Sequence, residues 1–122
     1  MPDVRAGPSA RTGYVVVLLR GELDITNSAS TARILQAAVA PQLRIIADLA
    51  EVTFMDCRSV RELMSVRARA QQAGGALLLA GLQPAVRRLL CHLDLIGLLP
   101  VFASADEAAN GRQEPRGALA AR

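Results

Sequence analysis

The sequence predicts an α/β fold, and three observations indicate it. The chain contains three short segments rich in apolar residues, Tyr14 to Leu19, Ile45 to Leu49 and Ala76 to Ala80. These segments are apolar at consecutive positions rather than at alternate ones, which is typical of strands covered on both faces. The intervals between them are long enough for a crossover helix, the connection that parallel strands require.

The first interval predicts a helix near Asn27 to Val39. At about 100° per residue, its apolar side chains fall on one arc, and polar residues fall opposite. The arc contains Thr31, Ile34, Leu35, Ala38 and Val39, and the opposite side contains Arg33 and Gln36. Thr26 or Asn27 has a side chain suited to cap the start of this helix, and Pro41 ends the helical pattern. We therefore expect a helix that packs one face on the core.

The second interval predicts a helix near Cys57 to Ala73. Its apolar face contains Val60, Leu63, Met64, Val66, Ala68 and Ala70, and its polar face contains Arg58, Arg61, Glu62, Ser65 and Arg69. Arg67 falls within the apolar arc, so its side chain either extends outward to water or meets a partner there. The remaining pattern predicts a short helix from Pro84 to Leu90, a strand near Val101 and a closing helix from Ser104. Ser104 and Glu107 have the spacing of a capping box.

A chain of 122 residues has the usual size of one domain. Residues 1–12 lack periodicity and are expected to be a flexible N-terminal lead, although Asp3 to Arg5 is compatible with a short edge strand. Residues 13–109 are expected to form the domain, and residues 110–122 a flexible C-terminal tail. An edge strand near the N-terminus can pair within one chain or between two, so the oligomeric state stays open.

The charge distribution argues against a nucleic-acid partner. The net charge is +3, and all 14 basic residues are arginine. Residues 13–109 nevertheless contain nine arginines and nine acidic residues, so the excess charge lies at the two ends. A neutral body lacks the clustered basic surface that duplex binding needs. Tyr14, Phe54 and Phe102 are the only aromatic residues, which leaves few platforms for stacking with single-stranded bases.

Cysteine usage and hydropathy suggest a cytoplasmic protein. Cys57 and Cys91 are the only cysteines and show neither a disulfide framework nor the spacing of a metal site, so we expect reduced thiols and no cofactor. The longest uninterrupted apolar runs are about five residues, whereas a membrane span needs ~18 to 20. We expect neither a membrane span nor a secretion signal, because the first residues contain no apolar run.

Two segments place acidic residues where a predicted strand leads into a predicted helix. Gly21-Glu22-Leu23-Asp24 follows the first strand, and Phe54-Met55-Asp56-Cys57-Arg58-Ser59 precedes the second helix. In open α/β sheets, ligands and partners bind at the carboxyl edge of the strands. The simpler interpretation is structural, because Asp56 is an ordinary helix N-cap and the acidic residues of the first segment can end a strand in solvent.

At these residues the sequence resembles the STAS domain of bacterial anti-sigma factor antagonists. The resemblance consists of Gly21-Glu22-Leu23-Asp24, Phe54-Met55-Asp56 followed by Val60, Gly74-Gly75 before an apolar strand, and Gly81 with Pro84 and Val86-Arg87-Arg88-Leu89. It extends over about Tyr14 to Ala109. It implies a mixed sheet of about four or five strands packed with about four helices. It also implies a non-catalytic module that captures an anti-sigma factor, often a serine kinase of ATPase fold, and thereby releases a sigma factor.

The resemblance implies a regulatory position that Cys57 occupies. In the family, the residue after the aspartate is a serine, and its phosphorylation ends capture. A phosphate there meets free N–H groups at the helix start but adds about two negative charges beside the aspartate. Neither Cys57 nor Arg58 is a substrate for a serine kinase. Ser59 lies roughly 160° from Cys57 around the helix, so we do not expect it to substitute.

From these features we expect a partner-binding surface and no catalytic, cofactor or metal residue. The expected contact residues are Glu22, Asp24, Asp56, Cys57, Arg58, Ser59, Arg61 and Glu62. Because Cys57 replaces the phosphoacceptor, the protein is expected to remain competent for capture; the alternative is a degenerate domain that binds no partner. Cys57 itself is either an inert replacement for serine or a redox-sensitive thiol, since helix N-termini favour the thiolate.

STAS-like domains also occur in membrane transport complexes, so an accessory subunit of such a complex is the alternative function. An enzyme is not expected. The chain contains no lysine for a P-loop and no Gly-x-Ser-x-Gly elbow. Cys91 and His92 are neighbours in a predicted helix, where their side chains point about 100° apart, so they do not form a catalytic dyad.

Overall fold

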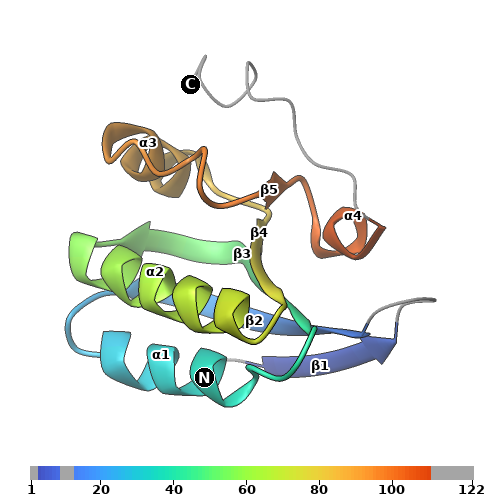
Figure 1. Cartoon of the computed structure of the whole chain (residues 1–122). Helices are drawn as coiled ribbons and strands as arrows, with labels where there is room; N and C mark the ends of the chain where they lie inside the picture. The colour runs from blue at the N-terminus through green and yellow to red at the C-terminus, as the bar shows by residue number, and fades with distance from the viewer. Residues whose placement is uncertain (1–2, 9–12, 111–122) are drawn as a thin grey trace.

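The computed structural model describes residues 3–8 and 13–110. In chain order its elements are β1 (Asp3–Pro8), β2 (Gly13–Leu23), α1 (Ser28–Ala37), β3 (Arg44–Met55), α2 (Cys57–Gln72), β4 (Ala76–Ala80), α3 (Pro84–His92), β5 (Val101–Phe102) and α4 (Ala105–Asn110). The strands form one sheet in the order β1-β2-β3-β4-β5 (Figure 1). β1 is antiparallel to β2, and the other neighbours are parallel. The predicted mixed sheet with four helices is confirmed.

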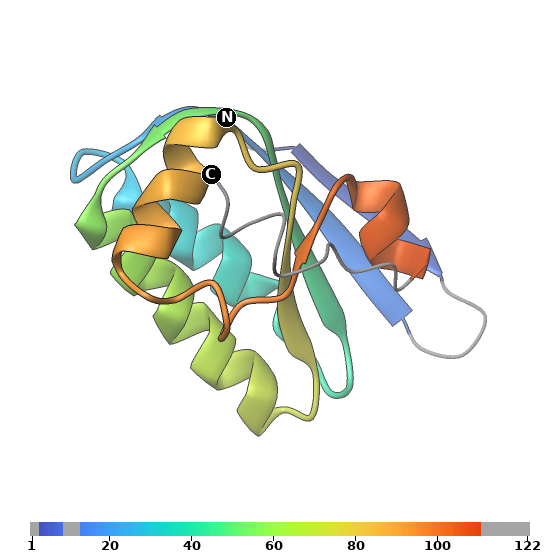
Figure 2. The same ribbon diagram turned by 90° about the horizontal axis from the view of Figure 1, so that it is seen from above.

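The two faces of the sheet are covered by different helices. The larger core cluster lies against α1, α2 and α3, and the smaller cluster joins Ile46, Leu78 and Phe102 to α4. Figure 2 shows α4 on the other side of the strands from α1, α2 and α3. Ile45 and Ile46 point to opposite faces, and both are fully buried. The consecutive apolar pattern of the sequence therefore reflects burial on both faces.

The first strand confirms the alternative of an edge strand at Asp3 to Arg5, which extends further than predicted, to Pro8. Residues 3–8, which were expected within a flexible lead, pair with β2 from Asp3 opposite Leu18 to Pro8 opposite Gly13. An edge strand needs main-chain pairing on one side only, so it requires no run of apolar residues and tolerates a terminal proline. The other residues of the predicted lead, and residues 111–122 of the predicted tail, lie outside the described part of the chain.

The long helix α2 agrees with its predicted bounds, and two of its side chains need comment. Ala68 was predicted on the apolar face but is exposed, which a methyl side chain tolerates at little cost. Arg67 is half-buried, and its Nε donates a hydrogen bond to the Leu98 carbonyl oxygen at 2.9 Å. Of the two predicted alternatives for Arg67, contact with a partner group within the chain is therefore the correct one.

β2 and β3 extend beyond their predicted ends, and the ladder between them contains two irregularities. The ladder passes from Leu18 opposite Asp48 to Arg20 opposite Glu51, so β3 has one residue more than β2 over this interval. A second extra residue precedes the pair of Glu22 and Phe54. β-Bulges of this kind re-aim the side chains that follow them. On β3, only Arg44 to Asp48 pair with β4, and on β2 the pairing with β1 ends at Leu18. Beyond these residues, β2 and β3 pair only with each other and continue as a two-stranded ribbon.

The spacing of the buried residues in β3 reflects these bulges. Leu49, Val52 and Met55 are buried at intervals of three residues, whereas a regular strand buries every second residue on one face. The altered interval explains why the sequence predicted a strand that ends at Leu49. Glu22 and Phe54, which were predicted in connecting segments, consequently belong to paired strands.

Gly75 is required by a close approach between backbones. A Cβ atom built at this position would lie 2.0 Å from the carbonyl oxygen of Leu43. Gly81 has a φ of 69°, a conformation that residues with side chains rarely adopt. These two glycines of the resemblance therefore have a role in the fold.

Candidate functional site

The two acidic segments singled out in the sequence come together at the end of the ribbon. Leu23 pairs with Met55, and the Asp56 N–H donates to the Leu23 carbonyl oxygen at 3.1 Å. The ends of β2 and β3 and the starts of α1 and α2 consequently share one end of the molecule, at the left of Figure 1. We call residues 20–27 and 51–62 the ribbon edge. The two segments that the sequence singled out separately are thus neighbours in the structure.

Asp56 joins the ribbon edge to α2 as the helix N-cap. Its carboxylate accepts a hydrogen bond from the Ser59 N–H at 2.8 Å. This hydrogen bond lowers the pKa of Asp56, against an opposing effect of partial burial, and the Ile25 amide adds a weaker lowering effect. The carboxylate is therefore ionised at neutral pH. The predicted capping role of Asp56 is confirmed, and that role does not conflict with partner contact.

The loop between β2 and α1 is held by its own side chains. The Asp24 carboxylate accepts hydrogen bonds from the Thr26 N–H, at 2.9 Å, and from the Thr26 hydroxyl. Asn27 Oδ1 accepts from the Asp24 N–H at 3.0 Å, and Asn27 Nδ2 donates to the Glu22 carbonyl oxygen at 2.8 Å. This network gives the loop one preferred conformation.

Asn27 has a different role from the one predicted. It occupies the N-cap position of α1, as expected, but its side chain makes no capping hydrogen bond. Both polar groups of the side chain are instead used to organise the preceding loop. The residue type predicted its position, whereas the direction of its side chain depends on the fold of the loop.

Two arginines of the ribbon edge are paired with acidic residues. Arg20 Nε lies 3.3 Å from a Glu51 carboxylate oxygen on the neighbouring strand. Arg58 Nε lies 3.9 Å from a Glu62 carboxylate oxygen one helical turn further on. Such exposed pairs contribute little to stability, but they reduce the local positive charge. Arg61 is also exposed on α2.

Cys57 and Ser59 differ sharply in accessibility. Cys57 is the first residue of α2 and is exposed, whereas Ser59 is only 4% exposed. Two positions along a helix turn a side chain to the opposite side, and Ser59 faces the seam between α1 and α2. Ser59 is therefore removed from the expected contact surface. The other seven expected residues are exposed or half-buried.

Sequence reasoning did not predict the exposed apolar side chains of the ribbon edge. Ile25 is 70% exposed, and Phe54 is 47% exposed. Ile25 lies between Asp24 and Thr26 in a polar segment, and an apolar residue without a periodic partner was the available signal. Phe54 neighbours the buried Met55 and therefore faces away from it, on the part of β3 that extends beyond its pairing with β4.

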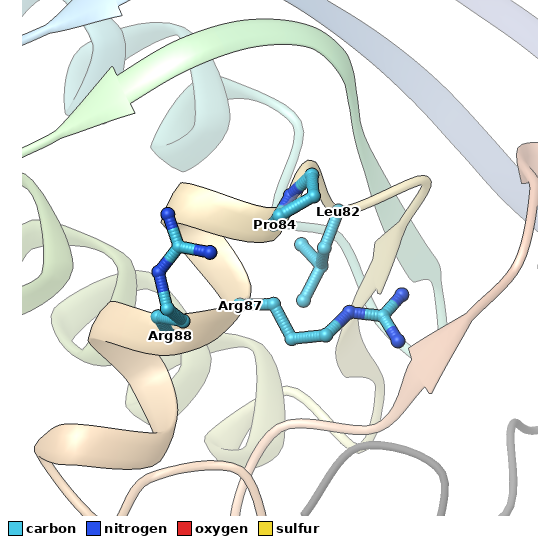
Figure 3. Close-up of a pocket in the computed structure, with 4 residues that line it drawn as sticks. All are labelled: Leu82, Pro84, Arg87 and Arg88. Carbon is cyan, nitrogen blue, oxygen red and sulfur yellow. The ribbon is translucent and has the colours of Figure 1, made fainter. Parts of the chain in front are cut away.

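A separate depression of about 390 Å³ lies at the start of α3 and is lined by Leu82, Pro84, Arg87 and Arg88. Figure 3 shows the two guanidinium groups pointing in different directions, so they do not converge on a common ligand position. In the described part of the chain, no group of three or more His, Cys, Asp or Glu side chains is arranged to hold a metal ion. Among residues 3–8 and 13–110, no helix is long and apolar enough to cross a bilayer.

The fold and the ribbon edge together define an α/β module whose exposed surface is made from the loop between β2 and α1 and from the start of α2. A family model described as the STAS domain matches residues 6–108. That range includes most of the chain, and the chain therefore belongs to the STAS domain family.

Solved structures show the same fold at low sequence identity. The anti-sigma factor antagonist SpoIIAA in its unphosphorylated form is 21% identical, with a TM-score of 0.71 over 89% of this chain and 95% of that one. An anti-sigma factor antagonist from Mycobacterium paratuberculosis is 21% identical, with a TM-score of 0.73 over 89% and 93% of the two chains. A sulfate transporter family protein from Wolinella succinogenes is 18% identical, with a TM-score of 0.68 over 88% and 87%. No curated protein matches the chain.

Proposed function

We propose that this protein captures an anti-sigma factor of the serine-kinase, ATPase-fold type through the ribbon edge, and thereby releases a sigma factor. The observation that carries the proposal is the position of Cys57, exposed at the first residue of α2 beside the Asp24 loop. Membership of the STAS family and the likeness to two anti-sigma factor antagonists support it. In this function the protein is a cytoplasmic binding module that performs no catalysis and needs no cofactor.

The ribbon edge has the physical properties of a recognition surface. Its loop is ordered by the hydrogen bonds of Asp24 and Asn27, so binding requires little further ordering. The exposed side chains of Arg58 and Arg61 offer hydrogen-bond donors at the start of α2. The surface thus combines a preorganised loop with groups of both charges.

We further propose that capture by this protein is not ended by phosphorylation at the helix start. The exposed residue is a cysteine, and the nearest hydroxyl on α2, that of Ser59, belongs to a residue that is 4% exposed. A kinase must bring the accepting oxygen into line with the γ-phosphate, which a buried side chain does not permit without local unfolding. The complex should therefore persist in the presence of ATP.

Binding to purified kinase-type anti-sigma factors from the genome that encodes this chain tests the proposal. Charge reversal by Glu22→Lys or Asp24→Lys should weaken binding by about tenfold or more, because the new positive charge would face the partner groups that attract a carboxylate. Arg33→Glu, on the exposed side of α1, is the matched control and should leave affinity unchanged. Full affinity in both edge variants would place the contact surface elsewhere.

The alternative is an accessory subunit of a membrane transport complex. The likeness to the Wolinella succinogenes protein concerns the fold, which the anti-sigma factor antagonists share to a similar degree. It therefore does not favour transport over capture. Co-purification with membrane transport components, together with no binding to any kinase-type anti-sigma factor, would overturn the proposed function.

A further inference from the structure

The ribbon edge carries two of the four large apolar side chains that are exposed in the described residues. These four are Ile25, Phe54, Leu93 and Leu98, with exposed fractions of 70%, 47%, 38% and 46%. Phe54 is also one of only three aromatic residues in the chain. Single exposed apolar residues are common on proteins, but a pair within one polar and charged surface indicates an interaction site.

Ile25 and Phe54 lie on the two chain segments that meet at the ribbon end. Phe54 is paired with Glu22 in the ladder, and Met55 is paired with Leu23, two residues before Ile25. The Ile25 amide also influences the Asp56 carboxylate, which follows Met55 in the chain. The ladder and the α2 cap therefore hold together the two backbone segments that carry these apolar side chains.

The loop around Ile25 is already ordered in the free protein. Asp24 and Thr26, the residues on either side, are joined by hydrogen bonds through the Asp24 carboxylate, and Asn27 ties the loop to Glu22. An anchor held in this way loses little conformational entropy when a partner covers it. Ile25 is thus exposed because the loop presents it and not because the loop lacks structure.

The charges around this apolar pair are mainly negative. Arg20 and Arg58 are paired with Glu51 and Glu62, so their charges largely cancel locally. The remaining charges of the ribbon edge are the carboxylates of Glu22, Asp24 and Asp56 and the guanidinium of Arg61, a local net charge of −2. The whole chain carries +3, so the acidic excess is a property of this surface.

We propose that Ile25 and Phe54 are the apolar anchors of the ribbon edge, and that they insert into an apolar recess of the partner that is rimmed by basic side chains. This inference rests on the proposed function and specifies the partner surface that the same edge fits. An apolar centre with a charged rim is the usual composition of a protein interface, and aromatic anchors carry much of the binding energy.

The test is isothermal titration of a purified kinase-type anti-sigma factor with the full chain and with single variants. Ile25→Ser and Phe54→Ser should each weaken binding by about 10- to 30-fold. Leu98→Ser removes an apolar side chain of the same exposure as Phe54 away from the ribbon edge, and it should change affinity by less than about twofold. Circular dichroism checks that each variant is folded, which is expected because all three side chains are exposed.

A second readout uses Cys57, which lies on the same surface. Binding should slow the reaction of the Cys57 thiol with iodoacetamide, while Cys91, half-buried on α3, serves as the internal reference. Increasing salt should weaken binding of the native chain, because the acidic rim faces a basic one.

The two proposals fail in different ways. If Ile25→Ser and Phe54→Ser bind like the native chain while Glu22→Lys and Asp24→Lys bind weakly, the apolar anchor is overturned and capture by the ribbon edge stands. If the apolar variants bind weakly but affinity rises with salt, the basic rim is overturned. If the native chain binds no kinase-type anti-sigma factor, the proposed function and this inference fall together.

Discussion

Asn27→Ala tests the role of the loop that precedes α1. The substitution removes two hydrogen bonds, one of 3.0 Å from the Asp24 N–H and one of 2.8 Å to the Glu22 carbonyl oxygen. Each is worth about 1 kcal/mol net, and water replaces part of that at a half-exposed site, so the free energy of unfolding should fall by about 1 kcal/mol. A loss of about 1 kcal/mol in loop order should also weaken partner binding by about fivefold.

Urea unfolding measures the change in stability, hydrogen exchange at the Asp24 amide measures the loss of loop order, and titration with the partner measures the change in affinity. Asn27→Ser separates loop organisation from helix capping, because serine is a good N-cap residue but is too short to bridge to Glu22. We expect it to behave like Asn27→Ala in hydrogen exchange and binding. Full recovery of stability and binding with serine would show that Asn27 acts as a helix cap, and our account of the loop would then be wrong.

Two further predictions concern stability. Gly75→Ala should lower the free energy of unfolding by about 3 kcal/mol or more, because its Cβ would lie 2.0 Å from the Leu43 carbonyl oxygen; an unchanged urea midpoint would contradict this contact. Asp56 has a lowered pKa in the folded protein, so its contribution to stability is complete above the ordinary value of 3.8 and is lost as the pH falls below it. The Tm difference between the native chain and Asp56→Asn should therefore shrink from about pH 5 to about pH 2, and a constant difference would argue against the ionised cap.

The central architecture could be predicted because it depends on local patterns. Three apolar segments with intervals of helical length are sufficient to indicate parallel strands with crossover helices. Ala76 to Ala80 was predicted with the bounds that β4 has, and Asp56 was predicted as the cap that it is. These features depend on neighbouring residues, which the sequence displays directly.

The features that could not be predicted depend on contacts between distant segments. β1 pairs through its backbone, so residues 3–8 carry no apolar pattern that distinguishes a strand from a lead. The bulges of β3 change the burial interval at Leu49, Val52 and Met55, which hid the length of the strand. Ser59 is different, because it lies on the same arc of α2 as the buried Leu63, Val66 and Ala70; the helical wheel therefore indicates its burial, which was missed when Ser59 was assigned to the contact surface.

The sequence predicted the charged residues of the candidate site but did not predict its exposed apolar residues. Asp24 and Asp56 stood out because acidic residues between a strand and a helix match a known pattern. Ile25 and Phe54 did not, because an apolar residue is ordinarily assigned to the core and its exposure depends on how the ribbon ends. Apolar anchors at an edge of this kind therefore become recognisable only when the fold is known.

The most direct test of the central claim is to incubate the native chain and Cys57→Ser with a kinase-type anti-sigma factor and ATP. Intact mass then measures the phosphate transferred to each chain. We predict that the native chain acquires no phosphate and stays bound, whereas Cys57→Ser gains one phosphate at residue 57 and is released. Phosphate on the native chain, at Ser59 or at any other residue, together with its release, would contradict the claim that Cys57 leaves capture without a phosphorylation switch.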